Sequence, residues 1–159
     1  MTISKWVHRV IQMLERIPHS AIAILGRFSL AAVFWKSGQT KVEGFAIDLV
    51  EGSVNLGLPR LADGAITLFR EEYHVPVLSP ELAAPLAALG EHLFAALLLI
   101  GLATRFSALA LLGMTAVIQV FVYPGAYPTH GTWAALLLYL MARGPGKVSI
   151  DHWLARRPV

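Results

Sequence analysis

The chain has 159 residues, of which 56% are hydrophobic and only 14% are charged, and its formal net charge is +3. About a quarter of the residues of a soluble domain are charged, so this composition argues against a soluble protein and favours a chain embedded in a lipid bilayer. The length allows one domain, residues 1–159, and the absence of cysteine excludes thiol–disulfide exchange by the chain itself. The 13 Lys and Arg residues are spread along the chain, which is typical of membrane topology signals and not of nucleic-acid binding.

Residues 1–18 predict an amphipathic helix that lies in the membrane interface. Ile3, Val7, Val10 and Leu14 recur every three or four residues, and basic residues fall between them. Pro18 ends the pattern. No small-residue cleavage site follows, so we expect the segment to be retained.

Four apolar segments predict membrane spans, at about 20–38, 83–103, 106–122 and 129–143. The fourth covers only about 22 Å at about 1.5 Å per residue, less than the hydrocarbon core of about 30 Å, so we expect it to pack in the bundle with its ends near the interface. Residues 149–157 predict a second interfacial helix. The expected fold class is therefore all-α: an integral membrane four-helix bundle with amphipathic interfacial helices at the N- and C-termini.

The segment between the first two predicted spans is too long to be a mere connection. Ile66, Phe69 and Tyr73 have helical spacing, so we expect a partly helical outer loop that caps the bundle. An even number of spans places both termini on one side. Basic residues gather on that side and acidic residues in the loop, which predicts a multi-pass protein of the bacterial inner membrane with both termini cytoplasmic.

Polar residues at similar depths of four different spans are the candidate site. A charge in the hydrocarbon core costs at least several kcal/mol unless it is paired. Glu91 shares a helix face with small alanines, so we expect it to face the bundle, to pair with Arg27 or with a lysine, and to serve as a proton acceptor. The candidate ligand-binding residues are Arg27, Lys36, Gln39, Lys41, Gln119 and Tyr139. A purely structural cluster and a partner interface remain open alternatives for these residues.

Three histidines are weaker candidates for a metal site. His74, His92 and His130 could share a metal only if the outer loop folds inward. A bis-histidine haem site would need a second histidine at the depth of His92, and the sequence has none, so we do not expect haem. The candidate cofactor is a quinone.

Two stretches carry a resemblance to a known family. R-F-S-L-A-A-V-F-W-K-S-G-Q-T-K-V-E-G-F (27–45) and G-E-H-L-F-A-A-L-L-L-I-G-L-A-T-R-F-S-A-L-A-L-L-G-M (90–114) resemble the first three spans of the DoxX family of small four-helix membrane proteins. The family pattern maps onto Glu91, Gly101, Leu102, Thr104 and Arg105, and the resemblance covers about residues 22–143. Segments 68–73, 117–124 and 142–146 resemble a proteobacterial branch often encoded beside enzymes that modify cysteine-rich peptides for copper handling.

The resemblance implies the fold and, more loosely, a function. Some relatives are membrane subunits of a thiosulfate:quinone oxidoreductase, and others are linked to oxidative-stress complexes or to membrane-protein assembly. We therefore expect an accessory subunit of a redox or copper-stress system, not a stand-alone enzyme, that binds a quinone-like ligand. The alternatives are a non-enzymatic assembly factor or scaffold for a membrane or periplasmic partner, and a small-solute transport component. The expected partners are the lipid bilayer, another protein and further copies of the chain, but not nucleic acid.

Overall fold

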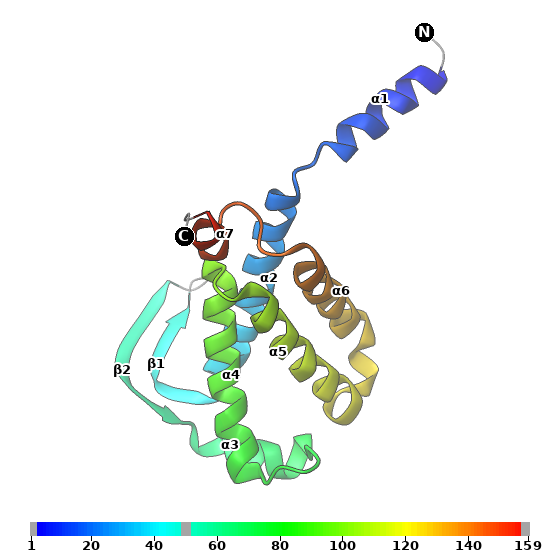
Figure 1. The fold of residues 1–159 in the computed structure, drawn as a ribbon. Helices are drawn as coiled ribbons and strands as arrows, with labels where there is room; N and C mark the ends of the chain where they lie inside the picture. Colours follow the sequence, from blue (N-terminus) through cyan, green and yellow to red (C-terminus); the bar gives the residue numbers. More distant parts are fainter. Residues whose placement is uncertain (1–2, 49–51, 157–159) are drawn as a thin grey trace.

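The computed structural model describes residues 3–48 and 52–156 of the chain (Figure 1). The helical segments are α1 (Ile3–Glu15), α2 (His19–Gln39), α3 (Asp63–Leu68), the π-helical η1 (Phe69–Tyr73), α4 (Pro80–Ile100), α5 (Thr104–Val117), the π-helical η2 (Ile118–Val122), the 3₁₀ turn η3 (Pro124–Ala126), α6 (Tyr127–Arg143) and α7 (Ile150–Ala155). The strands are β1 (Val42–Asp48) and β2 (Ser53–Leu61).

Three helical segments of the described chain are long and apolar enough to cross a membrane: α2, α4 and the continuous α5–η2. The helix α6 has 17 residues, which span about 26 Å at about 1.5 Å per residue, so it is short for a crossing. In the bundle, α2 packs against α4 and α6, and α5 packs against the same two helices. The predicted helical membrane protein is thus confirmed. A membrane crossing by α6 stays a prediction.

The expectation of an all-α fold was wrong for the outer loop. Strands β1 and β2 pair antiparallel as a hairpin beside the bundle (Figure 1). β-branched residues such as Val42, Ile47 and Val54 favour extended backbone, whereas the sequence interpretation relied on the helical spacing further along. That later part was correct, because α3 and η1 occupy residues 63–73.

The main core lies between α2, α4, α5 and α6. Leu30, Phe34, Leu98, Leu111 and Leu137 are all at most 1% exposed there. A smaller cluster lies where α3 and η1 pack on the start of α4, around Ala65, Phe69, Ala83 and Ala84. Large apolar side chains also cover the outside of the bundle, which suits lipid surroundings; examples are Leu25, Phe28, Leu89, Phe106 and Leu109.

Both described ends of the chain lie at the same end of the bundle (Figure 1). There α1, which precedes Pro18, extends away from the bundle, with apolar side chains such as Ile3 and Trp6 exposed. The predicted C-terminal helix is present as α7, while residue 157 lies outside the described residues. Contact of α1 and α7 with the membrane interface remains a prediction.

A glycine ends α4 at a crowded position. Gly101 has a φ of +71°, in the left-handed region, and a Cβ there would lie 2.5 Å from Ser149 Cβ and 2.8 Å from Arg27 Nη1. Left-handed backbone costs an L-residue about 1–2 kcal/mol. Any side chain at Gly101 therefore meets both strain and a clash.

We expect Gly101→Ala to lower the apparent unfolding temperature of the detergent-purified protein. The matched control is Gly113→Ala in α5, where a Cβ meets nothing within 4 Å and alanine favours the helix by about 1 kcal/mol. The control should be as stable as the parent or more stable. An equal fall in the unfolding temperature of both variants would contradict this account of Gly101.

Candidate functional site

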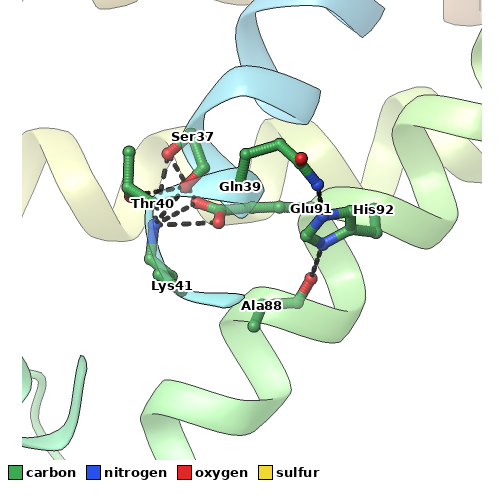
Figure 2. A network of polar contacts seen from close by, with 7 residues as sticks. All are labelled: Ser37, Gln39, Thr40, Lys41, Ala88, Glu91 and His92. Atoms are coloured by element: carbon green, nitrogen blue, oxygen red, sulfur yellow. Dashed lines mark hydrogen bonds and ion pairs between the residues drawn. The ribbon is translucent and has the colours of Figure 1, made fainter. Parts of the chain in front are cut away.

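A buried ion pair lies where α2 ends (Figure 2). Lys41 Nζ is 2.8 Å from Glu91 Oε2 of α4, and both side chains are only 3% exposed. Ser37 Oγ donates to Glu91 Oε1 at 2.9 Å, and Lys41 Nζ donates to Ser37 O and to Ser37 Oγ at 3.1 and 3.2 Å. The chain turns at this point, with Lys41 N donating to Gly38 O at 2.9 Å. This turn directs the lysine side chain back toward the bundle.

His92 lies next to this pair in a second set of hydrogen bonds (Figure 2). Its Nδ1 is 2.7 Å from Ala88 O, which can only accept, so Nδ1 carries the proton and Nε2 accepts from Gln39 Nε2 at 2.7 Å. Gln39 Oε1 in turn accepts from Ile47 N at 2.9 Å, and Trp35 Nε1 donates to Ile47 O at 3.2 Å. Both nitrogens of His92 are therefore used, and the set ties β1 to α2 and α4.

The ion pair lines a cavity of about 530 Å³ between α4, α5–η2, α6 and η1. Most of the wall is apolar, and Ser37, Lys41 and Glu91 form a polar part of it. Leu86 and Val117 also line the cavity and are 54% and 37% exposed, so it extends to the outer surface of the bundle between α4 and α5. Other wall residues are Phe94, Met114, Ile118, His130 and Trp133.

Both π-helical segments border this cavity. Phe69 and Tyr73 of η1 line it, and so do Ile118 and Val122 of η2. π-Helical turns are rare and frequently occur at functional sites, because the extra residue re-aims side chains. Their presence on two sides of one cavity is consistent with a binding site.

Hydrogen bonds hold η1 in place beside the cavity. Tyr123 Oη donates to Glu72 Oε1 at 2.5 Å, and its ring packs on Tyr73 with centroids 5.8 Å apart. The Glu72 carboxylate that accepts this hydrogen bond raises the pKa of Tyr123, so the phenol keeps its proton. Arg70 also forms a 2.5 Å ion pair with Glu81 at the start of α4.

Arg27 is not the partner of Glu91. Its guanidinium donates instead to four carbonyls: Leu98 and Leu99 at 3.0 and 2.9 Å, and Pro145 and Val148 at 2.8 Å each. The first two are among the last carbonyls of α4, which have no partner within the helix. Arg27 thus joins the end of α4 to the segment before α7.

The other predicted ligand-binding residues are dispersed. Lys36 is exposed on α2. Tyr139 Oη is 2.7 Å from His19 Nδ1, and Gln119 Oε1 is 2.8 Å from His130 Nδ1. Similar depth along four helices therefore did not bring these side chains into one pocket, because they point in different directions around the helix axes. Of the predicted set, Lys41 and Glu91 line the cavity.

The three histidines considered for a metal are also apart. Within residues 3–48 and 52–156, no three His, Cys, Asp or Glu side chains are grouped so that they could hold a metal ion. His92 lies beside the ion pair, His130 on the cavity wall, and His74 is exposed after η1.

Sequence reasoning missed Ser37 and the tyrosines. Ser37 precedes Lys41 by four residues, the spacing that places two side chains on one helix face, so this signal was present. Tyr73 and Tyr123 were not placed at the site, because nothing local in the sequence shows that η1 packs against η2.

The remaining landmark residues of the resemblance have structural roles. Asp151 of α7 accepts from Ala103 N and Thr104 N at 2.7 and 2.9 Å, which caps the start of α5. Arg105 donates to the carbonyls of Met141 and Ala142 at the end of α6. Gly101 ends α4 as described above. These residues close the end of the bundle opposite the cavity.

The apolar helices, with polar groups paired between them, define a multi-pass helical membrane protein. The model of the DoxX family matches residues 22–124, which include most of α2, all of α4 and α5, and the Lys41–Glu91 pair. The chain belongs to the DoxX family. No curated protein and no solved structure shows a significant match to it.

Breaking the ion pair should destabilise the protein strongly, because it leaves one charge buried. We expect Lys41→Met to lower stability by about 3–5 kcal/mol and the double variant Lys41→Met/Glu91→Gln to recover much of that loss. Chemical unfolding in detergent followed by circular dichroism measures both. Lys36→Met is the control, since Lys36 is exposed. A double variant no more stable than Lys41→Met would argue against the pairing.

Proposed function

We propose that this protein binds a small, mostly apolar molecule with an oxygen-bearing head group inside the membrane, as an accessory subunit of a redox system. The observation that carries the proposal is the cavity of about 530 Å³ with apolar walls and a buried Lys–Glu pair. Ligand sites are typically apolar concavities with a few converging polar groups. Ionisable residues within membrane segments are functional candidates by default.

The hydrogen-bonding capacity of the pair favours one kind of head group. Lys41 Nζ already contacts Ser37 O, Ser37 Oγ and Glu91, so its three donors are used. Glu91 Oε2 has the ion-pair contact with Lys41 but accepts no directed hydrogen bond. The hydrogen-bonding capacity that remains is therefore that of an acceptor, Glu91 Oε2. A hydroxyl donor such as that of a hydroquinone suits it. Glu91 would then be the proton acceptor, with Lys41 stabilising its charge.

The biological setting of this proposal rests on the family resemblance. Membership of a family that includes quinone-linked subunits makes a quinone or hydroquinone the first ligand to test, and a link to copper stress has the same basis. We place the protein in the bacterial inner membrane with both termini cytoplasmic, following the distribution of basic residues. These assignments are separate from the ligand-binding hypothesis: an experiment can disprove them and leave that hypothesis standing.

We expect the purified protein to bind a decyl-substituted hydroquinone under anaerobic conditions, and to bind its dimethyl ether at least about tenfold more weakly, because the ether has no hydroxyl donor. Quenching of tryptophan fluorescence measures binding, since Trp133 lines the cavity. Glu91→Gln should reduce the preference for the hydroquinone.

Filling the cavity gives an independent test. Gly113→Leu places a side chain where the wall is open and should abolish binding, while Gly64→Leu, which is also unobstructed but outside the cavity, should not. Equal affinity for both ligands, or binding that survives Gly113→Leu, would rule out this site.

A scaffold function is the second candidate, and the hairpin favours it. Val54, Leu56 and Leu58 of β2 are 63%, 74% and 91% exposed. Exposed apolar side chains in a group are typical of interaction surfaces. Phe69 and Tyr73 of the outer loop line the cavity and are not part of this surface.

If the scaffold hypothesis is correct, Leu56→Ser/Leu58→Ser should abolish co-purification of a stoichiometric membrane or periplasmic partner, and Glu91→Gln should not. Affinity purification from native membranes with quantitative mass spectrometry is the measurement. Leu109→Ser, on the outer face of α5, controls for the general effect of removing an exposed leucine.

A further inference from the structure

A second cavity lies at the other end of α2, far from the Lys41–Glu91 pair. It has a volume of about 730 Å³, opens to the surface and is lined by the start of α2, the start of α5, the end of α6, the following loop and α7. Its wall carries three cationic side chains, those of Arg105, Arg143 and Lys147, and one carboxylate, Asp151. Both oxygens of Asp151 are used by Ala103 N and Thr104 N. The wall is therefore predominantly basic.

Two histidines of the same wall have ring nitrogens without a partner. His19 Nε2 and His152 Nε2 are buried and make no hydrogen bond in the structure. A buried polar nitrogen without a partner costs about 1–3 kcal/mol. For His19, Tyr139 Oη already occupies Nδ1 at 2.7 Å. If the phenol donates there, Nε2 carries the proton, and the cavity presents a free donor.

The start of α2 adds a further positive contribution. No side chain caps this helix, whose N-cap position is Pro18. The first N–H groups of a helix lack partners within it and carry the positive end of the helix dipole. His19 and Ser20, which follow Pro18, both line the cavity. Cationic side chains, unpartnered imidazole nitrogens and a helix N-terminus converge here, and an oxyanion is favoured by cationic side chains and by a helix N-terminus.

We propose that this cavity binds a phosphate ester, with Arg143 and Lys147 providing charge and His19 and His152 providing donors. The volume suits a head group larger than a bare oxyanion. The neighbouring surface is apolar: Ile22, Leu25, Trp153 and Leu154 are exposed, so acyl chains could lie against it. Basic pockets between membrane helices bind the head groups of anionic phospholipids. A soluble phosphate ester would meet the same groups, and the experiment separates the two sources.

The test uses the full-length protein purified in a neutral detergent. Its thermal stability is measured with dioleoyl phosphatidylglycerol, with dioleoyl phosphatidylcholine and with glycerol phosphate, and native mass spectrometry determines lipid retention. We expect phosphatidylglycerol to be retained in preference to phosphatidylcholine and to raise the unfolding temperature. Arg143→Gln/Lys147→Gln should weaken this binding by about tenfold or more, because each basic residue near an anionic lipid contributes about 1 kcal/mol.

The control removes the same number of charges elsewhere. Lys5→Gln/Arg16→Gln changes one exposed basic residue of α1 and one in the turn that follows it, both outside the cavity, and should leave retention unchanged. Stabilisation by phosphatidylglycerol alone identifies a lipid head group, and stabilisation by glycerol phosphate as well identifies the phosphate ester itself. The proposal is overturned if neither compound stabilises the protein, or if both double variants respond alike. None of these outcomes depends on the hydroquinone experiment.

Discussion

Within a bilayer, polar groups between the helices must find their partners in the protein itself, because hydrocarbon offers none. Two basic residues of this chain meet that requirement in different ways. Arg27 uses its rigid fork of donors on four backbone carbonyls at one end of the bundle. Lys41 uses its compact ammonium group on one carboxylate and one serine at the other end. The first arrangement joins secondary structure elements, and the second leaves an ionisable pair on a cavity wall.

That difference separates a structural role from a candidate functional one. Arg27 donates its hydrogen bonds to backbone carbonyls, which do not titrate and are fixed parts of the main chain. The Lys41–Glu91 pair, by contrast, joins two side chains and lines a cavity. The two cavities follow the same division: one is apolar with a charged pair, and the other is basic and lies where the helices end.

Much of the helical architecture could be predicted from the sequence, because hydropathy and helix length are local properties. The burial of Arg27 and Glu91 also followed from the energetics of a charge in hydrocarbon. Their partners did not follow, since the reach of Lys41 depends on the turn after α2 and Arg27 meets a segment more than a hundred residues later. The hairpin was missed because the sequence reasoning followed the helical spacing of residues 66–73 and did not use the β-branched residues on either side of the loop, such as Ile47 and Val54.

The hydrogen bonds of Ile47 have a mechanical consequence. Trp35 and Gln39 hold this one residue of β1 through its carbonyl and its amide, and Gln39 also donates to His92, the neighbour of Glu91. Pulling β1 away from the bundle breaks the contact with Gln39 and frees that amide to rotate, which leaves His92 Nε2 without its donor. The side chain of Gln39 therefore links the hairpin to His92, the residue beside the buried carboxylate. In this molecule strand β1 and the buried carboxylate of Glu91 are connected through two hydrogen bonds and one peptide unit.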